Sequence, residues 1–338
     1  MSKASAPGKL ILFGEHFVVY GLPAIATAIE ARTTAIVEKA DKYFLEDNRP
    51  ETPGYKIEKY GQQLDSIQRI FKAMRINPKK TPVKITLGGN LVAASGVGAS
   101  AASCSAIAAA LNDYFGLGFG KEKLNNIAYE GEKGYHGTPS GIDNSCSTFG
   151  GFIWFKKDPA KNTIFPLDLK LSLAMVIGNT GITSNTRKVV EEVKGEKEKN
   201  PEKFKTIFDV YTDLVDDARL AIERKDLNEI GKLMNKNHGL LREIGVSCKE
   251  LEELVDIALK NGALGAKLTG TGRGGLMIAL VGEQDARKVA TAFERAGYKS
   301  EITKIGRKES EWNEDSRGSD RSVRSNCRQK TDRTAQEK

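Results

Sequence analysis

The sequence has few of the features that mark membrane, secreted or zinc-scaffold proteins. No apolar run approaches the ~18 residues of a membrane-spanning helix. Only 10 of the 338 residues are proline, and the cysteines at 104, 146, 248 and 327 show no CxxC or CxxH spacing. That spacing argues against a disulfide framework or a structural zinc site. The apolar run at 10–13 is too short for the core of a signal peptide. We therefore expect a soluble cytoplasmic protein without a membrane partner.

Charge is abundant, but it is not arranged as in a nucleic-acid-binding protein. The chain has 52 Lys and Arg against 44 Asp and Glu, a formal net charge of +8. The excess is spread along the chain, without the basic runs and interleaved aromatics of a nucleic-acid surface. It is compatible with small anionic substrates and equally with ordinary solubility charge. We expect no nucleic-acid partner.

The hydrophobic pattern divides the chain into two parts, and the length agrees with two domains. The first part is expected to have strands at 9–13, 17–20, 32–38, 82–87 and 151–155 and helices at 63–76, 99–115, 121–133 and 141–148. The second part is expected to have strands at 171–177, 263–268, 276–281 and 300–305, helices through most of 184–260, and a helix at 284–296. Its β-α-β-β-α-β-like order predicts a ferredoxin-like layer.

The composition changes at Gly306. Among the residues from 306 to 338 only Trp312, Val323, Cys327 and Ala335 are apolar, and they show no periodicity. Such a segment cannot bury enough apolar surface to offset the entropy of ordering it. We therefore expect a disordered tail.

Ionisable residues lie at both ends of a buried-looking strand near the N-terminus. Lys9 follows Gly8, and Glu15 and His16 follow Gly14, in the run GKLILFGEHFVVYG. Strand ends often form pockets, because the strand holds the geometry while its ends stay in contact with water. The simpler alternative is a core strand with solvated charges beside it.

A second segment, ASGVGASAA at 94–102, opens the Ala-rich helix. Its small residues would let a phosphate approach the backbone, and the free N–H groups and dipole of the helix would attract that anion. Ser100 would present a hydroxyl to a phosphate oxygen or to Mg²⁺; alternatively it caps the helix. The span 96–101 fits the dinucleotide pattern GxGxxA, which requires a strand directly before it. The expected strand ends at Leu87, so a Rossmann oxidoreductase is disfavoured.

Two later segments combine glycines with polar residues. Glu132 and Asp143 lie on either side of a Gly- and Pro-containing loop, as a candidate metal ligand and a candidate base. Asp143 could equally be a helix N-cap residue. The third glycine cluster, 270–275, fits GxGxxG, but a strand-like run follows it where a nucleotide-binding motif requires a helix. By itself it indicates a hairpin.

Together the four segments resemble the GHMP small-molecule kinases, whose three motifs occur in this order. The run GEHFVVYG and the segment PSGIDN at 139–144 are similar to mevalonate kinases in particular. The likeness covers residues 3 to 305, with two departures in the second motif: Ala99 stands where the family usually has serine, and the customary upstream proline is missing. It implies an α+β two-domain fold: a ribosomal-protein-S5-like ATP-binding domain over 1–165 and a helical, ferredoxin-like domain over 166–305.

The resemblance also implies a reaction, the ATP-dependent phosphorylation of the C5 hydroxyl of (R)-mevalonate in isoprenoid synthesis, with Mg²⁺ as cofactor. Asp143 matches the general base, Lys9 would hold it in its charged form, and Ser100 and Glu132 match the Mg²⁺ ligands. The ATP phosphates would meet Gly96, Val97, Gly98, Ala99, Ser100, Ala101, Gly270 and Gly272. Mevalonate would meet Glu15, His16 and Asp143, and we select Lys157, just after strand 151–155, as the cation for its carboxylate.

Two alternatives remain open at this point. The chain could be another GHMP kinase, such as a phosphomevalonate kinase, or a catalytically silent nucleotide-binding homologue. A silent homologue is expected to have lost Lys9, Glu132 or Asp143, and all three are present. The sequence does not distinguish a monomer from a homodimer. His136 and His238 are expected to be structural.

Overall fold

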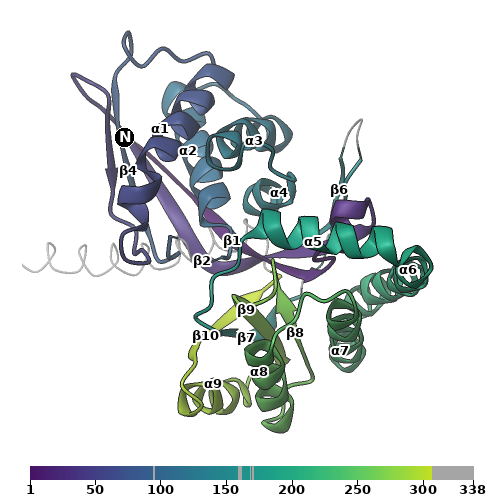
Figure 1. The fold of residues 1–338 in the computed structure, drawn as a ribbon. Helices are drawn as coiled ribbons and strands as arrows, with labels where there is room; N and C mark the ends of the chain where they lie inside the picture. Colours follow the sequence, from purple (N-terminus) through teal and green to yellow (C-terminus); the bar gives the residue numbers. More distant parts are fainter. Residues whose placement is uncertain (94–95, 159–161, 168, 170, 307–338) are drawn as a thin grey trace, which may run out of the picture.

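The computed structural model describes residues 1–93, 96–158, 162–167, 169 and 171–306, which form two connected lobes (Figure 1). The N-terminal lobe contains strands β1 (Ser2–Phe13), β2 (Pro23–Lys39), β3 (Phe44–Asp47), β4 (Val83–Gly89), β5 (Phe152–Lys156) and β6 (Thr163–Leu167), the 3₁₀ helix η1 (Phe17–Tyr20) and helices α1 (Tyr55–Ala73), α2 (Ala99–Phe115), α3 (Lys121–His136) and α4 (Ile142–Phe149). The remainder contains strands β7 (Leu173–Asn179), β8 (Gly265–Thr269), β9 (Leu276–Val281) and β10 (Lys299–Ile305) and helices α5 (Thr186–Lys199), α6 (Pro201–Glu223), α7 (Leu227–Glu243), α8 (Lys249–Lys260) and α9 (Ala286–Arg295). The fold is therefore of the α+β class, as predicted.

Strand β2 organises the N-terminal sheet. Its 17 residues pair antiparallel with β1 along one edge, and with β5 and then β4 along the other. The alternating burial of β2 over its second half sends one set of side chains beneath α1, α2 and α3 (Figure 1). Strand β6 pairs with β5, so the expected domain boundary at residue 165 falls within a strand of this sheet.

The C-terminal strands form the ferredoxin-like layer. They lie in the order β10-β7-β9-β8, and every neighbouring pair is antiparallel. Helices α5 to α8 connect β7 to β8, and α9 connects β9 to β10. The predicted β-α-β-β-α-β order is therefore confirmed, with a run of helices in the place of the first connection.

Contacts between the lobes set their relative position. Ile305 of β10 pairs with Ile29 of β2, which joins the two sheets. The hydroxyl of Tyr211 on α6 donates to the carbonyl of Pro23 (2.8 Å), and its ring stacks on Phe17 with centroids 3.9 Å apart. The turn after β1 thus packs against α6 in the second half of the chain.

The predicted elements differ from the structure mainly in the first 75 residues. The strand expected at 17–20 is wrong: this β-branched run is the 3₁₀ helix η1. Gly14, His16 and Gly21 all have positive φ values (116°, 61° and 78°), so the chain turns sharply on both sides of η1 and cannot extend. Helix α1 begins at Tyr55 rather than at residue 63.

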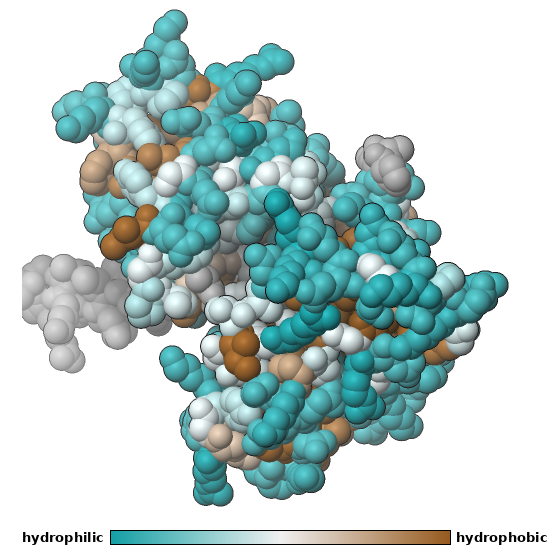
Figure 2. Space-filling model, viewed as in Figure 1, coloured by the Kyte–Doolittle hydropathy of each residue, from teal (hydrophilic) through white to brown (hydrophobic). Residues whose placement is uncertain are grey.

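The surface on the face shown in Figure 2 is mainly hydrophilic, with hydrophobic residues in small separate patches. Among the described residues, no helix combines the length and the apolar character that crossing a membrane requires. The tail expected over 306–338 lies outside the described residues from 307 onward.

Candidate active site

The second glycine segment packs directly on β1, at Gly8 and Lys9. The backbone N–H of Lys9 donates to the carbonyl of Val97 (2.8 Å). A Cβ on Gly8 would lie 2.7 Å from that same carbonyl, and a Cβ on Gly98, where φ is +77°, would lie 2.8 Å from Cγ of Lys9. Glycine at both positions therefore lets the loop that precedes α2 close over the lysine side chain.

Lys9 and Asp143 form an ion pair at the head of this loop, with 3.1 Å between Nζ and Oδ1. Burial would lower the pKa of Lys9, but the charge and hydrogen bond of Asp143 raise it above its ordinary value. The side chain of Lys9 is 9% exposed and that of Asp143 is 31% exposed, so the carboxylate is the accessible member. The N-cap of α4 is Gly141, so Asp143 is not the cap and lies in the first turn.

Glu132 lies on α3, buried close to this pair. Its burial, and then the negative charge of Asp143, raise the pKa of Glu132 to about 8, although a hydrogen bond from Ser100 and the charge of Lys9 act in the opposite direction. Ser100 Oγ lies 3.3 Å from Nε2 of His136, and that nitrogen is 3.9 Å from Oε2 of Glu132. The N-cap of α2 is Gly98, so Ser100 is not the cap either.

His136 is the residue that sequence reasoning assigned to the structure alone. It follows Glu132 by one helical turn on α3, and residues four apart lie on the same face of a helix. That spacing is the signal that could have placed it beside the carboxylate. Burial lowers its pKa, so the imidazole is mostly neutral at pH 7.

The oxygen atoms of Ser100 and Glu132 fit a magnesium site of the kind that a nucleotide completes. Among the described residues no three His, Cys, Asp or Glu side chains come together as a metal cage. Mg²⁺ prefers oxygen ligands and usually takes one or two from protein, with substrate phosphates and water completing the shell. A divalent cation beside Glu132 would also favour the charged form that burial and Asp143 oppose.

The third glycine segment lies beside the other two. It joins β8 to β9, which pair as an antiparallel hairpin, as the pattern indicated. Thr269 Oγ1 donates to the carbonyl of Ile11 (3.0 Å), and the Nε2 of His16 hydrogen-bonds the carbonyl of Thr271 (2.7 Å). A Cβ on Gly96 would be 3.3 Å from Cδ1 of Leu276, so the two glycine loops are neighbours.

A fully buried ion pair also links the turn after β1 to β8, beside the third glycine segment. Nζ of Lys267 on β8 bonds Oε1 of Glu15, and both side chains are 0% exposed. Burial lowers the pKa of Lys267, and Glu15 only partly offsets this. Oε2 of Glu15 has no hydrogen-bond partner among the described residues. Sequence reasoning missed Lys267, because it lies in a strand that otherwise reads as apolar.

The structure thus brings together most of the residues predicted for the site. The described members of the group are Lys9, Glu15, His16, Gly96, Val97, Gly98, Ala99, Ser100, Ala101, Glu132, Asp143, Gly270 and Gly272. Lys157 is exposed just beyond β5, and its carbonyl lies 3.7 Å from the place of a Cβ on Gly21. Its role remains a prediction.

Family models match both lobes of the chain. The model described as the GHMP kinases N terminal domain matches residues 65–151, and the one described as GHMP kinases C terminal matches residues 218–299. The mevalonate kinase of Pyrococcus horikoshii is 37% identical over 326 residues, which cover 90% of this chain and 95% of that protein. The mevalonate kinase of Saccharolobus solfataricus is 30% identical, with 90% and 98% covered.

Solved structures show the same relationship. The structure of L. major mevalonate kinase in complex with R-mevalonate is similar with a TM-score of 0.84 and 38% identity, covering 90% of this chain and 96% of that chain. Streptococcus pneumoniae phosphomevalonate kinase, in complex with phosphomevalonate and AMPPNP, has a TM-score of 0.71 at 18% identity, covering 89% of this chain and all of that one. At that identity the likeness concerns the fold alone.

Proposed function

The chain belongs to the GHMP kinase family, and from this premise we propose that it transfers the γ-phosphoryl group of ATP to the C5 hydroxyl of (R)-mevalonate. The observation that carries the proposal is the Lys9–Asp143 pair, with its carboxylate partly exposed beside the glycine loop that opens α2. A nucleophile-orienting carboxylate next to a phosphate-binding helix is what phosphoryl transfer to an alcohol requires.

Asp143 would accept the proton of the C5 hydroxyl as its oxygen forms a bond to the γ-phosphorus. The bond from that phosphorus to the bridging oxygen of ADP breaks, and ADP leaves with the electron pair. Lys9 would orient the carboxylate of Asp143 through their ion pair. Backbone N–H groups at the start of α2 would bind the phosphate oxygens.

Mg²⁺ would be held by Ser100 and Glu132, and it would neutralise the charge that develops on the phosphates. The cation would favour the charged form of Glu132, against the burial and the charge of Asp143 that raise its pKa. His136, in contact with Ser100, would orient the serine hydroxyl.

Mevalonate would be recognised at the turn that follows β1. The unpartnered Oε2 of Glu15 is a buried acceptor, and such atoms are costly unless a ligand or water satisfies them. A mevalonate hydroxyl is a suitable donor. His16, whose ring faces the third glycine loop, would border the same pocket, and Lys157 stays the proposed partner of the mevalonate carboxylate.

The alternative substrate class is a phosphorylated one, as in phosphomevalonate kinase. The 38% identity to a mevalonate kinase solved with R-mevalonate, against 18% to a phosphomevalonate kinase, favours mevalonate. The intact Lys9–Asp143 pair disfavours a catalytically silent homologue.

A coupled assay of ADP release tests the assignment. With MgATP saturating, mevalonate, phosphomevalonate, galactose and homoserine are compared at equal concentrations. We expect kcat/KM for mevalonate to exceed each of the others by roughly a hundredfold or more, because a site built to bond specific hydroxyls discriminates strongly. Comparable values for mevalonate and any other acceptor would overturn the substrate, and no ADP release with any of them would overturn the activity.

A further inference from the structure

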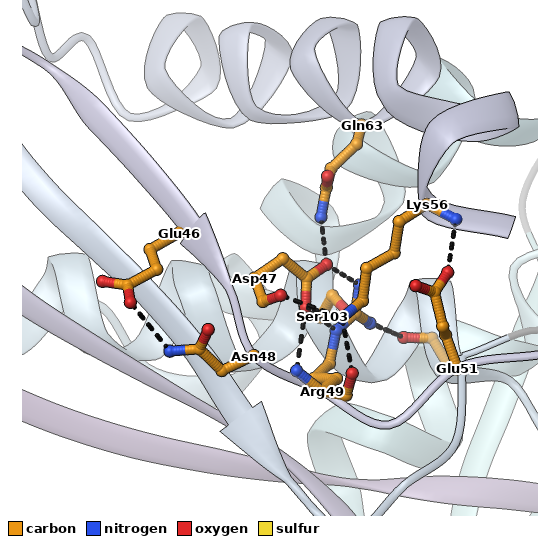
Figure 3. Close-up of polar contacts among 9 residues, drawn as sticks. Glu46, Asp47, Asn48, Arg49, Glu51, Lys56, Gln63 and Ser103 are labelled. Atoms are coloured by element: carbon orange, nitrogen blue, oxygen red, sulfur yellow. Dashed lines mark hydrogen bonds and ion pairs between the residues drawn. The ribbon is translucent and has the colours of Figure 1, made fainter. Parts of the chain in front are cut away.

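A cross-braced loop between β3 and α1 lies against the first turn of α2 (Figure 3). At its centre is Arg49, a residue only 5% exposed. Its guanidinium donates two hydrogen bonds to Asp47, from Nε to Oδ1 (2.9 Å) and from Nη2 to Oδ2 (2.6 Å). Gln63 of α1 donates to the same Oδ2 (2.7 Å). The arginine is therefore held from one side in a single orientation.

The other edge of the guanidinium faces α2. Nη1 of Arg49 donates to the carbonyl of Ala99 (3.3 Å) and to the hydroxyl of Ser103. That hydroxyl in turn donates to the carbonyl of Ala99 (2.8 Å). Two donors thus converge on one carbonyl at the start of the helix.

The carbonyl of Ala99 and the N–H of Ser100 belong to the same peptide group. Because that group is planar, holding the oxygen also sets the direction of the N–H bond. The N–H groups of the first helical turn have no partner within the helix, and they are the groups that bind an anion. A cation on the carbonyl oxygen also polarises the peptide and makes its N–H a stronger donor.

Asp47 supports this arrangement by keeping the arginine from turning away. Burial would raise the pKa of Asp47, but its hydrogen bonds and the charge of Arg49 lower it, so the pair stays charged. Only a fork of several donors can hold two carboxylate oxygens and reach a third acceptor. A lysine at position 49 could bond either Asp47 or the acceptors on α2, but not both.

We propose that Arg49 is a positioning residue for the nucleotide: it fixes the Ala99–Ser100 peptide so that the N–H of Ser100 faces the phosphates of ATP. The inference rests on the proposed function for the identity of the anion. Arg49 itself would not contact the substrate. It would act on ATP binding through the first turn of α2.

The experiment compares Arg49→Met and Arg49→Lys with the wild-type chain. The dissociation constant of MgATP is measured by calorimetry, and that of adenosine by competition against MgATP. We expect MgATP to bind about tenfold more weakly to both variants, as for one hydrogen bond to a charged group. Adenosine, which lacks phosphates, is expected to change by less than twofold, and the KM for mevalonate likewise.

Gln63→Met provides the matched control. It removes a bond to Asp47, and the hydrogen bond of Gln63 drawn in Figure 3 is to Asp47 and not to α2. A role limited to stability would lower the melting temperature in all three variants and leave the ratio of MgATP to adenosine affinity unchanged. If Arg49→Met does not fold, Arg49→Lys still decides the question, because it keeps the buried charge beside Asp47.

MgATP affinity within twofold of wild type in Arg49→Lys, or equal losses for MgATP and adenosine, would overturn the proposal. These binding measurements do not depend on mevalonate. A wild-type chain that binds MgATP without phosphorylating mevalonate would overturn the substrate assignment alone, whereas one that binds no nucleotide would overturn both.

Discussion

Two lysine–carboxylate pairs lie close together along the chain, one at Lys9 within β1 and one at Glu15 in the turn that follows it. They differ in exposure and in the direction of the lysine pKa shift. In the pair of Lys9 with Asp143, the side chains are 9% and 31% exposed. In the pair of Lys267 with Glu15, both are 0% exposed. The pKa of Lys9 is raised, because the attraction to Asp143 outweighs its burial. The pKa of Lys267 is lowered, because its burial outweighs the attraction to Glu15.

The comparison shows that environment, and not residue type, separates a reactive pair from a structural one. A partly exposed carboxylate can meet a substrate hydroxyl and exchange a proton with it. A fully buried pair is shielded from water, and removing one member leaves an uncompensated charge. The second pair instead connects the turn after β1 to β8 of the ferredoxin-like layer, and so holds the first and third glycine segments side by side.

The largest expected effect comes from removing the accessible carboxylate. Asp143→Asn should lower kcat by ~10²–10⁴-fold, the range of a positioned general base, with little change in the dissociation constant of MgATP. Steady-state kinetics and calorimetry measure the two. Glu130→Gln, an exposed carboxylate on α3, is the control and should keep the wild-type kcat. Turnover by Asp143→Asn close to that of the control would show that the pair is structural.

Breaking the buried pair should act on stability. Lys267→Met should lower the free energy of unfolding by ~3–5 kcal/mol, because it leaves Glu15 charged and unpaired in the interior. The double variant Lys267→Met, Glu15→Gln should recover part of this loss. Urea denaturation measures each value. A double variant no more stable than Lys267→Met would mean that an unpaired charge on Glu15 is not the source of the loss.

Glu132 extends the comparison to pH. Its pKa in the folded chain is raised to about 8, so the folded state binds this proton more tightly than the unfolded state, where the ordinary value is ~4.3. Protonated Glu132 therefore contributes its full stabilisation below the pKa of the unfolded state, and this contribution is lost as pH rises through the folded pKa of about 8.

Melting temperatures between pH 5 and pH 8.5, without metal, test this expectation. The wild-type chain should lose more stability across this window than Glu132→Gln, which cannot ionise. MgATP should reduce the difference in melting temperature between the two proteins near pH 8.5, because a cation favours the charged carboxylate. His136 lies 3.9 Å from Glu132, so the difference between the two proteins reports Glu132 together with any change it causes in the titration of that histidine. Parallel curves would contradict the raised pKa.

The smallest effect is expected from a segment that contains neither pair. Its composition predicts no packed contacts for the tail, so ending the chain after Arg307 should leave the free energy of unfolding within ~0.5 kcal/mol. Both KM values and kcat should also stay unchanged. Denaturation and the coupled assay measure these quantities, and a melting temperature lower by several degrees would indicate that Trp312 docks on the folded part.

Local sequence patterns predicted correctly those elements in which all neighbouring residues favour the same secondary structure. Helix α2 was expected at its observed bounds, because an Ala-rich run follows Gly98 and ends at Gly116. The same logic failed at η1, where β-branched residues favour a strand but the positive φ values around them impose a turn. The predicted site residues came from motifs, and Asp143, Lys9 and Glu132 do lie together.

The sequence by itself determined the helices, the hairpin of the third glycine segment and the family, because each depends on residues that are close along the chain. Only the tertiary structure decided which charges meet. Lys267 reaches Glu15 across 252 positions, and Arg49 reaches Ala99 across 50. The burial that lowers the pKa of Lys267 depends on elements from both lobes, whereas Arg49 is buried among elements of the N-terminal lobe. Desolvation is a property of the packed molecule, and no segment of the chain carries it alone.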